Sequence, residues 1–310
     1  MNKTKIEWCD STWNPVTGCL HDCEYCYARK IAERFGKKDD NSIFLKRIKL
    51  TKPLYYQDKK HVRRISPYPF GFSPTFHKYR LGEPQRKKKP QNIFVCSMAD
   101  LFGDWVPDEW IEEVFTACDN AQQHNYLFLT KNAAGYEKAI DNFAVEDRGS
   151  QDCYEFFKNF WFGISVTNRQ DLLKIEQLAD LEEGNRFLSI EPILEPLELH
   201  FTNDRCPVCG SSEVYQDNPK TCLGLPEWHC DCCCEWDSVD GKDLKTSIDW
   251  IIVGAETGNR KNKVAPKKEW IDSIVEQGKI FNIPVFMKDS LIPILGEENM
   301  LREFPEGLRR

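Results

Sequence analysis

The sequence contains no apolar run long enough to span a bilayer, and its first ten residues, MNKTKIEWCD, lack the apolar core of a secretion signal. It also lacks an excess of basic charge, because the net charge of its 310 residues is −7. That balance argues against a protein that coats nucleic acid indiscriminately. Internal repeats and low-complexity tails are absent as well. We therefore expect a globular protein of the cytoplasm with no membrane segment.

Cysteine, by contrast, is abundant, with fourteen residues in the chain. Three lie near the N-terminus and seven lie between Cys206 and Cys234. Disulfides rarely persist in a reducing compartment, so clustered cysteines point to metal binding. The other four are isolated in the sequence, and we expect them to pack in the interior: Cys9, Cys96, Cys118 and Cys153.

Short apolar runs alternate with amphipathic stretches over most of the chain. Seven runs are rich in β-branched or aromatic residues and read as strands buried on both faces: 12–18, 92–97, 126–130, 160–166, 186–190, 249–254 and 284–288. Helical patterns lie between several of them, at 107–122, 169–181 and 267–280. About seven strand–helix units predict an α/β protein with a parallel sheet, arranged as a partial TIM-type (β/α) barrel.

Two segments interrupt this alternation. Residues from about 37 to 91 are basic and aromatic, and we interpret them as a long ordered insertion after the first helix. Residues 202–246 hold the second cysteine cluster and resemble a separate small domain. The predicted organisation is therefore a first barrel part at 1–201, an inserted domain at 202–246, and a last barrel part at 247–310.

The stretch GCLHDCEYCYA places Cys19, Cys23 and Cys26 at spacings of three and two intervening residues. A structural zinc site needs four protein ligands, and the nearby candidates for a fourth are His21, Asp22 and Cys9. A [4Fe–4S] cluster held by only three thiolates has one iron left to bind another molecule. The spacing therefore favours an iron–sulfur cluster with an open coordination position.

The same motif, with Tyr25 before its last cysteine, resembles the signature of the radical S-adenosylmethionine superfamily. Longer blocks, which together span nearly the whole chain outside the second cysteine cluster, resemble the phage Gp37/Gp68 family, also called DUF5131: IEWCDSTWNPVTGC, YPFGFSPTFHKYRL, CSMADLF, FGISVTN, RFLSIEPIL, DWIIVGAETG and PVFMK. The resemblance implies a barrel of the radical S-adenosylmethionine kind, a [4Fe–4S] cluster on the three cysteines and S-adenosylmethionine as a second cofactor. Its activity would be reductive cleavage of S-adenosylmethionine to a 5′-deoxyadenosyl radical, with electrons from a flavodoxin- or ferredoxin-type donor.

Functional side chains of a parallel barrel lie at the carboxyl ends of its strands. The resemblance implies that Ser97, Met98 and Asp100, after the second strand, contact S-adenosylmethionine, with Asp100 pairing its amino group. Asp100 could instead cap a turn. After the fourth strand, Ser165 and Asn168 suit the ribose hydroxyls or the carboxylate, although Asn168 could equally begin the next helix as its N-cap.

Three later strand ends carry further candidates. A carboxylate directly after an apolar strand is costly to bury unless it is paired or bound, which favours a functional Glu191. Gly254 would allow close approach to adenine, and Glu256 would project into the barrel mouth. Lys288 could hold a carboxylate or phosphate of the substrate, or neutralise one of these two glutamates.

The second cysteine cluster contains CPVCG and, after twenty residues, WHCDCCCEW. Two paired knuckles at this separation predict a zinc ribbon, with these ligands: Cys206, Cys209, Cys230 and Cys233. Cys232 could replace Cys233, and a second iron–sulfur cluster is the competing interpretation.

The basic runs KKHVRR and RKKK, interleaved with tyrosines and phenylalanines, suit a nucleic acid strand with stacked bases, or a solvated surface over an aromatic core. With the phage association of the resembled family, they favour modification or repair of a nucleic acid base or nucleotide. Two alternatives stay open, namely a radical enzyme acting on a peptide or small metabolite, and a non-enzymatic zinc-binding scaffold.

Overall fold

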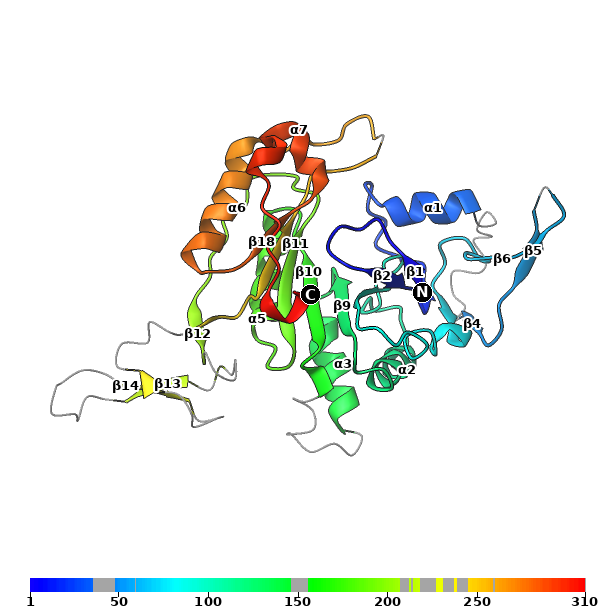
Figure 1. Cartoon of the computed structure of the whole chain (residues 1–310), viewed down its shortest axis with the longest axis horizontal. Helices are drawn as coiled ribbons and strands as arrows, with labels where there is room; N and C mark the ends of the chain where they lie inside the picture. Colours follow the sequence, from blue (N-terminus) through cyan, green and yellow to red (C-terminus); the bar gives the residue numbers. More distant parts are fainter. Residues whose placement is uncertain are drawn as a thin grey trace.

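The structure is a computed structural model. It describes residues 1–35, 48–58, 60–145, 156–206, 212, 214–217, 227–230, 237–238, 245–258 and 260–309 (Figure 1). Among these residues, no helix has the length and apolar character needed to cross a membrane.

The central feature is an eight-stranded sheet in the order β1-β2-β8-β9-β10-β11-β17-β18. Seven of its strands are parallel: β2 (Ser11–Trp13), β8 (Asn92–Val95), β9 (Asn125–Thr130), β10 (Phe160–Ser165), β11 (Asn185–Ile190), β17 (Trp250–Val253) and β18 (Val285–Met287). The short β1 (Asn2–Lys3) pairs antiparallel with β2 at one edge. The sheet curls but stays open between β1 and β18, so it is a half-barrel. Six of the seven predicted strands are confirmed, and the half-barrel is compatible with the predicted partial barrel. The prediction for 12–18 was wrong as a single strand, because only its start lies in β2 and residues 16–17 form β3 in a separate sheet.

Helices cover the outer face of this sheet (Figure 1). The three amphipathic patterns are confirmed as α2 (Asp108–Asp119), as η3 (Arg169–Leu172) continuing into α5 (Leu173–Ala179), and as α6 (Lys268–Ile280). Helix α2 follows Pro107 and has Asp108 and Glu109 in its first turn, where acidic side chains complement the helix dipole. Three other helices are α1 (Tyr27–Phe35), α3 (Ala134–Val145) and α7 (Ile292–Leu295). Single-turn 3₁₀ helices are η2 (Lys78–Arg80), η4 (Asp289–Leu291), η5 (Glu297–Asn299) and η6 (Glu306–Leu308).

Alternate residues of the strands contribute to two separate apolar clusters, as expected for a sheet buried on both faces. The larger cluster lies between the sheet and its helices and includes Phe115, Phe128 and Phe162. The smaller fills the concave side and includes Trp8, Phe94, Leu127, Phe187 and Trp250. Cys96 and Cys118 are buried in the larger cluster, as predicted for isolated cysteines; Cys9 is partly buried, and Cys153 lies outside the described residues.

The basic and aromatic segment contributes strands to two small sheets, one of which also includes a strand from the N-terminal part of the chain. One has the order β3-β7-β4, with β3 (Val16–Thr17), β7 (Thr75–His77) and β4 (Ile48–Leu50). The other is a hairpin of β5 (Tyr55–Gln57) and β6 (Arg63–Ile65), which projects from the body (Figure 1).

The cysteine-rich segment also contains two small sheets in its described part. They are β12 (Asn203–Arg205) with β16 (Lys245–Thr246), and β13 (Val214–Asp217) with β14 (Glu227–Cys230) and β15 (Asp237–Ser238). Of the predicted zinc ligands, Cys206 is buried and Cys230 ends β14. Cys209, Cys233 and the alternative Cys232 lie outside the described residues, so the zinc ribbon stays a prediction.

Candidate functional site

A cavity of about 370 Å³ opens at the carboxyl ends of the parallel strands. This volume lies within the roughly 300–1,000 Å³ of small-molecule sites. Its walls come from the ends of six strands and from the loop that carries the three cysteines, here called the cysteine loop (residues 18–26). Trp8, Phe94 and Leu129 form apolar parts of the wall. Parallel strands therefore bring together side chains that are far apart in the sequence.

Ten of the thirteen residues predicted for the cluster, cofactor and substrate line this cavity: Cys19, Cys23, Tyr25, Cys26, Ser97, Asp100, Ser165, Glu191, Glu256 and Lys288. Met98, Asn168 and Gly254 do not line it. Met98 packs instead against Ala28 and Phe72, beside a second, smaller cavity. A Cβ at Gly254 would lie 3.1 Å from Cγ of Glu191, so this glycine leaves room for the glutamate side chain.

The backbone of the cysteine loop is fixed at its start. The amide of Gly18 donates to the carbonyl of Met98 at 2.9 Å, and the amide of Cys19 donates to the carbonyl of Phe72 at 3.2 Å. Gly18 has a φ of +90°, and a side chain there would overlap the backbone of Ser73. Glycine is therefore required at this position, directly before the first cysteine.

The thiols of the loop are partly withdrawn from solvent. Burial raises the pKa of Cys19 to about 12 and also raises the pKa of Cys23. Thiols in such an environment stay protonated unless a cation compensates the thiolate charge. Among the described residues, no group of three or more His, Cys, Asp or Glu side chains is arranged around a common point for a single metal ion.

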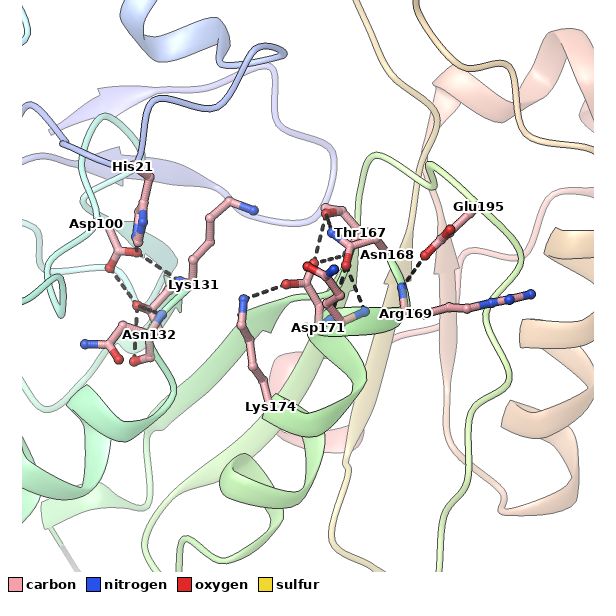
Figure 2. Close-up of polar contacts among 12 residues, drawn as sticks. His21, Asp100, Lys131, Asn132, Thr167, Asn168, Arg169, Asp171, Lys174 and Glu195 are labelled. Atoms are coloured by element: carbon pink, nitrogen blue, oxygen red, sulfur yellow. Dashed lines mark hydrogen bonds and ion pairs between the residues drawn. The ribbon is translucent and has the colours of Figure 1, made fainter.

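Asp100 joins the cysteine loop to the sheet (Figure 2). Its Oδ2 lies 2.7 Å from Nε2 of His21 and accepts from the amide of Lys131 at 2.9 Å. Its Oδ1 accepts from the hydroxyl of Thr130 at 2.7 Å and from the amide of Phe102 at 3.1 Å. Asp100 thus caps a turn, one of the two roles expected for it, and also holds His21.

Two further residues of the loop bond to strand ends. The ammonium of Lys131, which follows β9, donates to the hydroxyl of Tyr25 at 2.8 Å. Burial lowers the pKa of Lys131, but its interactions with Tyr25 and then Cys23 outweigh burial and the net shift is upward. Across the cavity mouth, Arg260 makes two 2.7 Å contacts with Glu256 and one 3.0 Å contact with Glu24 of the loop. The hydrogen bond from Arg260 lowers the pKa of Glu256.

Lys288 forms an ion pair with Glu191. Its Nζ lies 2.6 Å from Oε1 of Glu191 and 3.8 Å from Oε2 of Glu7. The two paired side chains are 16% and 23% exposed, so both are accessible from the cavity. Lys288 therefore neutralises Glu191, one of the roles expected for it, while staying on the cavity wall.

The segment after β10 forms a local network beside the cavity (Figure 2). The side chain of Asn168 accepts from the amides of Gln170 and Asp171, which makes it the N-cap of η3. Oδ2 of Asp171 accepts from the amide and hydroxyl of Thr167 at 2.8 and 2.9 Å, and Lys174 pairs with Oδ1 at 2.6 Å. Of the two roles expected for Asn168, helix capping is the one seen.

Lys131 and Arg260 are site residues that the sequence reasoning missed. Lys131 directly follows a predicted strand, so the rule that selected Glu191 and Lys288 would also have selected it. Arg260 had no such signal, because it pairs with Glu24 across 236 positions of the chain.

Comparison with known proteins gives one match. The sequence model of DUF5131, described as a protein of unknown function, matches residues 3–291. No curated protein matches the chain. No solved structure matches it either.

Proposed function

The chain belongs to the DUF5131 family, and we propose that it is a radical S-adenosylmethionine enzyme with a [4Fe–4S] cluster on Cys19, Cys23 and Cys26. The observation that carries this proposal is the shared cavity. The three cysteines of a C-x3-C-x2-C loop line the same cavity as carboxylates, hydroxyls and two lysines at the carboxyl edge of a parallel half-barrel. An enzyme site on such a fold is expected at this edge.

The donor set fits such a cluster. Among the described residues, these three are the only cysteines on the cavity wall. Each thiolate of a [4Fe–4S] cluster binds a different iron, so the three sulfurs need not converge on one point. With three protein thiolates, one iron of the cluster would have no cysteine ligand and could bind the amino and carboxylate groups of S-adenosylmethionine.

When bound, the cluster would supply the electron that cleaves a carbon–sulfur bond of S-adenosylmethionine, giving methionine and a 5′-deoxyadenosyl radical that takes hydrogen from a substrate. The residues of the protein would bind and orient the molecules in the cavity. Glu191 and Glu256 line the cavity with carboxylates suited to cationic groups of a bound molecule. Ser165 and Ser189 line it with hydroxyls suited to a ribose. The apolar wall formed by Trp8, Phe94 and Leu129 excludes water from the reacting atoms.

The proposed substrate is a nucleic acid base or nucleotide, in a modification or repair reaction. Support comes from the concentration of basic and aromatic residues in the segment before β8. We further propose a flavodoxin- or ferredoxin-type electron donor, and a zinc ribbon with these ligands: Cys206, Cys209, Cys230 and Cys233.

The test is anaerobic purification with iron, sulfide and zinc analysis, followed by dithionite reduction with S-adenosylmethionine and an assay for 5′-deoxyadenosine. We expect about four irons per chain and formation of 5′-deoxyadenosine. Cys23→Ala should abolish iron binding and 5′-deoxyadenosine formation. The matched control Cys9→Ala, outside the cysteine loop, should retain the iron content and the activity of the unmodified protein. Zinc without iron after reconstitution, or iron without 5′-deoxyadenosine, would overturn the proposal.

A further inference from the structure

The β5–β6 hairpin is exposed on both of its faces. All six residues of its strands are exposed, and large apolar side chains are among the exposed residues of the hairpin and its base: Leu54 42%, Tyr55 47%, Tyr56 44%, Val62 46% and Ile65 50%. An isolated two-stranded ribbon is at best marginally stable in water. Such exposure on a projecting element marks a surface for a partner.

The charge of the chain is segregated toward this region. Residues 48–89 contain twelve Lys or Arg and two Asp or Glu, a net charge of +10. The remainder of the chain therefore carries −17, because the whole chain carries −7. A local positive excess on an otherwise acidic protein is complementary to a polyanion and attracts it to this segment.

The cations of the hairpin are held in a defined arrangement. Asp58 accepts from the amides of Lys60 and Val62, both at 2.9 Å, which fixes the turn. The same carboxylate lies 2.7 Å from Nε of Arg64. The guanidinium of Arg63 lies 4.0 Å from the centre of the Tyr55 ring. The arginine side chains are thus oriented before any partner binds, which lowers the entropic cost of binding.

We propose that the β5–β6 hairpin enters the major groove of double-stranded DNA; this inference rests on the proposed nucleic acid substrate. The major groove of B-form DNA admits a two-stranded β-ribbon, whereas that of A-form RNA is too deep and narrow for side chains to read. Sites for single strands are concave grooves, but this hairpin is a projecting ribbon (Figure 1). Its arginines and Lys60 supply the phosphate contacts.

The hairpin is also connected directly to the cavity walls. Its base is closed by a 2.8 Å hydrogen bond from the amide of Ser66 to the carbonyl of Leu54. Tyr68, two residues after Ser66, lines the smaller cavity. Phe72 follows four residues later and lines the main cavity. The Cα of Tyr68 therefore lies within about 11 Å of that of Ile65. The base of the hairpin is therefore joined to the cavity walls by a short segment of chain.

Fluorescence anisotropy of a labelled DNA duplex, titrated with metal-free protein, tests the proposal. The variant Lys60→Ala/Arg63→Ala should bind the duplex at least about tenfold more weakly. The slope of log binding constant against log salt concentration should become shallower by roughly 0.9 for each phosphate that a removed cation had neutralised. The matched control Lys267→Ala/Lys279→Ala changes two exposed lysines at α6 and should bind as the unmodified protein does.

Unchanged affinity in the hairpin variant would overturn the proposal. So would tighter binding of single-stranded DNA, of double-stranded RNA or of an acidic polypeptide than of the duplex. The binding assay needs neither cluster nor S-adenosylmethionine, and the hairpin variant should still form 5′-deoxyadenosine. Absence of 5′-deoxyadenosine formation in the unmodified protein would therefore count against the proposed function, while absence of duplex binding alone counts against the hairpin.

Discussion

Nε2 of His21 lies 2.7 Å from Oδ2 of Asp100, across 79 positions of the chain, and so joins the cysteine loop to the segment that follows β8. Tyr25 and Glu24 bond in the same way to Lys131 and Arg260. Side chains between the cysteines therefore tie the loop to the segments that follow β8, β9 and β17, in addition to the backbone hydrogen bonds of Gly18 and Cys19. All three contacts are made by protein side chains, so substitutions can test their role in positioning the thiols.

Replacing His21 by alanine should loosen the cysteine loop. A hydrogen bond to a charged group contributes about 1.5–3 kcal/mol, so local opening should become at least about tenfold more frequent. The measurement is the rate at which a thiol reagent modifies Cys19, Cys23 and Cys26 in metal-free protein, followed by mass spectrometry. His200→Ala, which changes an exposed histidine, is the control and should leave these rates unchanged. Equal rates in both variants, with circular dichroism unchanged, would show that the His21 contact does not restrain the loop.

The strands and most of the cavity wall could be predicted from the sequence because they follow local rules. Each strand is a short apolar run buried on both faces, and the residue after it must lie at the same edge of the sheet. The contacts that hold the cysteine loop could not be predicted, because Glu24–Arg260 and His21–Asp100 join distant segments without a recurring pattern. The β5–β6 hairpin could not be predicted either, because its two short strands lack the alternation of apolar and polar residues that indicates a strand.

The Glu191–Lys288 pair should respond unequally to removal of its two members. Lys288→Met leaves two carboxylates, Glu191 and Glu7, without their shared cation. It should lower the free energy of unfolding by about 2 kcal/mol. This loss is smaller than for a fully buried ion pair, because the side chains of Lys288 and Glu191 are partly exposed. Glu191→Gln leaves Lys288 facing Glu7 and should have a smaller effect. Urea denaturation measures both, and the double variant should lose less than the sum. A larger loss for Glu191→Gln would contradict this account of the ion pair.

Gly163 should not tolerate a side chain. It pairs directly with Phe187 in the β10–β11 register, and a Cβ at this position would overlap the Phe187 ring. Gly163→Ala should therefore lower the free energy of unfolding by about 1–3 kcal/mol through overpacking. The double variant Gly163→Ala/Phe187→Leu should lose less free energy of unfolding than the sum of the losses of the two single variants. Strict additivity in urea denaturation would show that the two positions do not clash.

His77 should make the fold sensitive to acid. Its buried ring lies 2.8 Å from the hydroxyl of Thr17, near Tyr79, Arg80 and Glu83. Burial lowers the pKa of His77 from its ordinary 6.5 to about 4, with a smaller contribution from Arg80. The unfolded chain therefore binds a proton at a higher pH than the folded chain does. The stability contributed by the neutral ring is complete above pH 6.5 and is lost as the pH falls from 6.5 toward 4.

His77→Gln removes this titration while keeping an amide that can bond to Thr17. Between pH 7 and pH 5, the unmodified protein should lose about 2 kcal/mol more free energy of unfolding than this variant does. Carboxylates titrate equally in both proteins and cancel in the comparison, which urea denaturation at the two pH values provides. His200→Gln, at an exposed position, should behave as the unmodified protein. Parallel losses in the His77 variant and the unmodified protein would mean that His77 is protonated in the fold, and that the contact with Thr17 does not depend on a neutral ring.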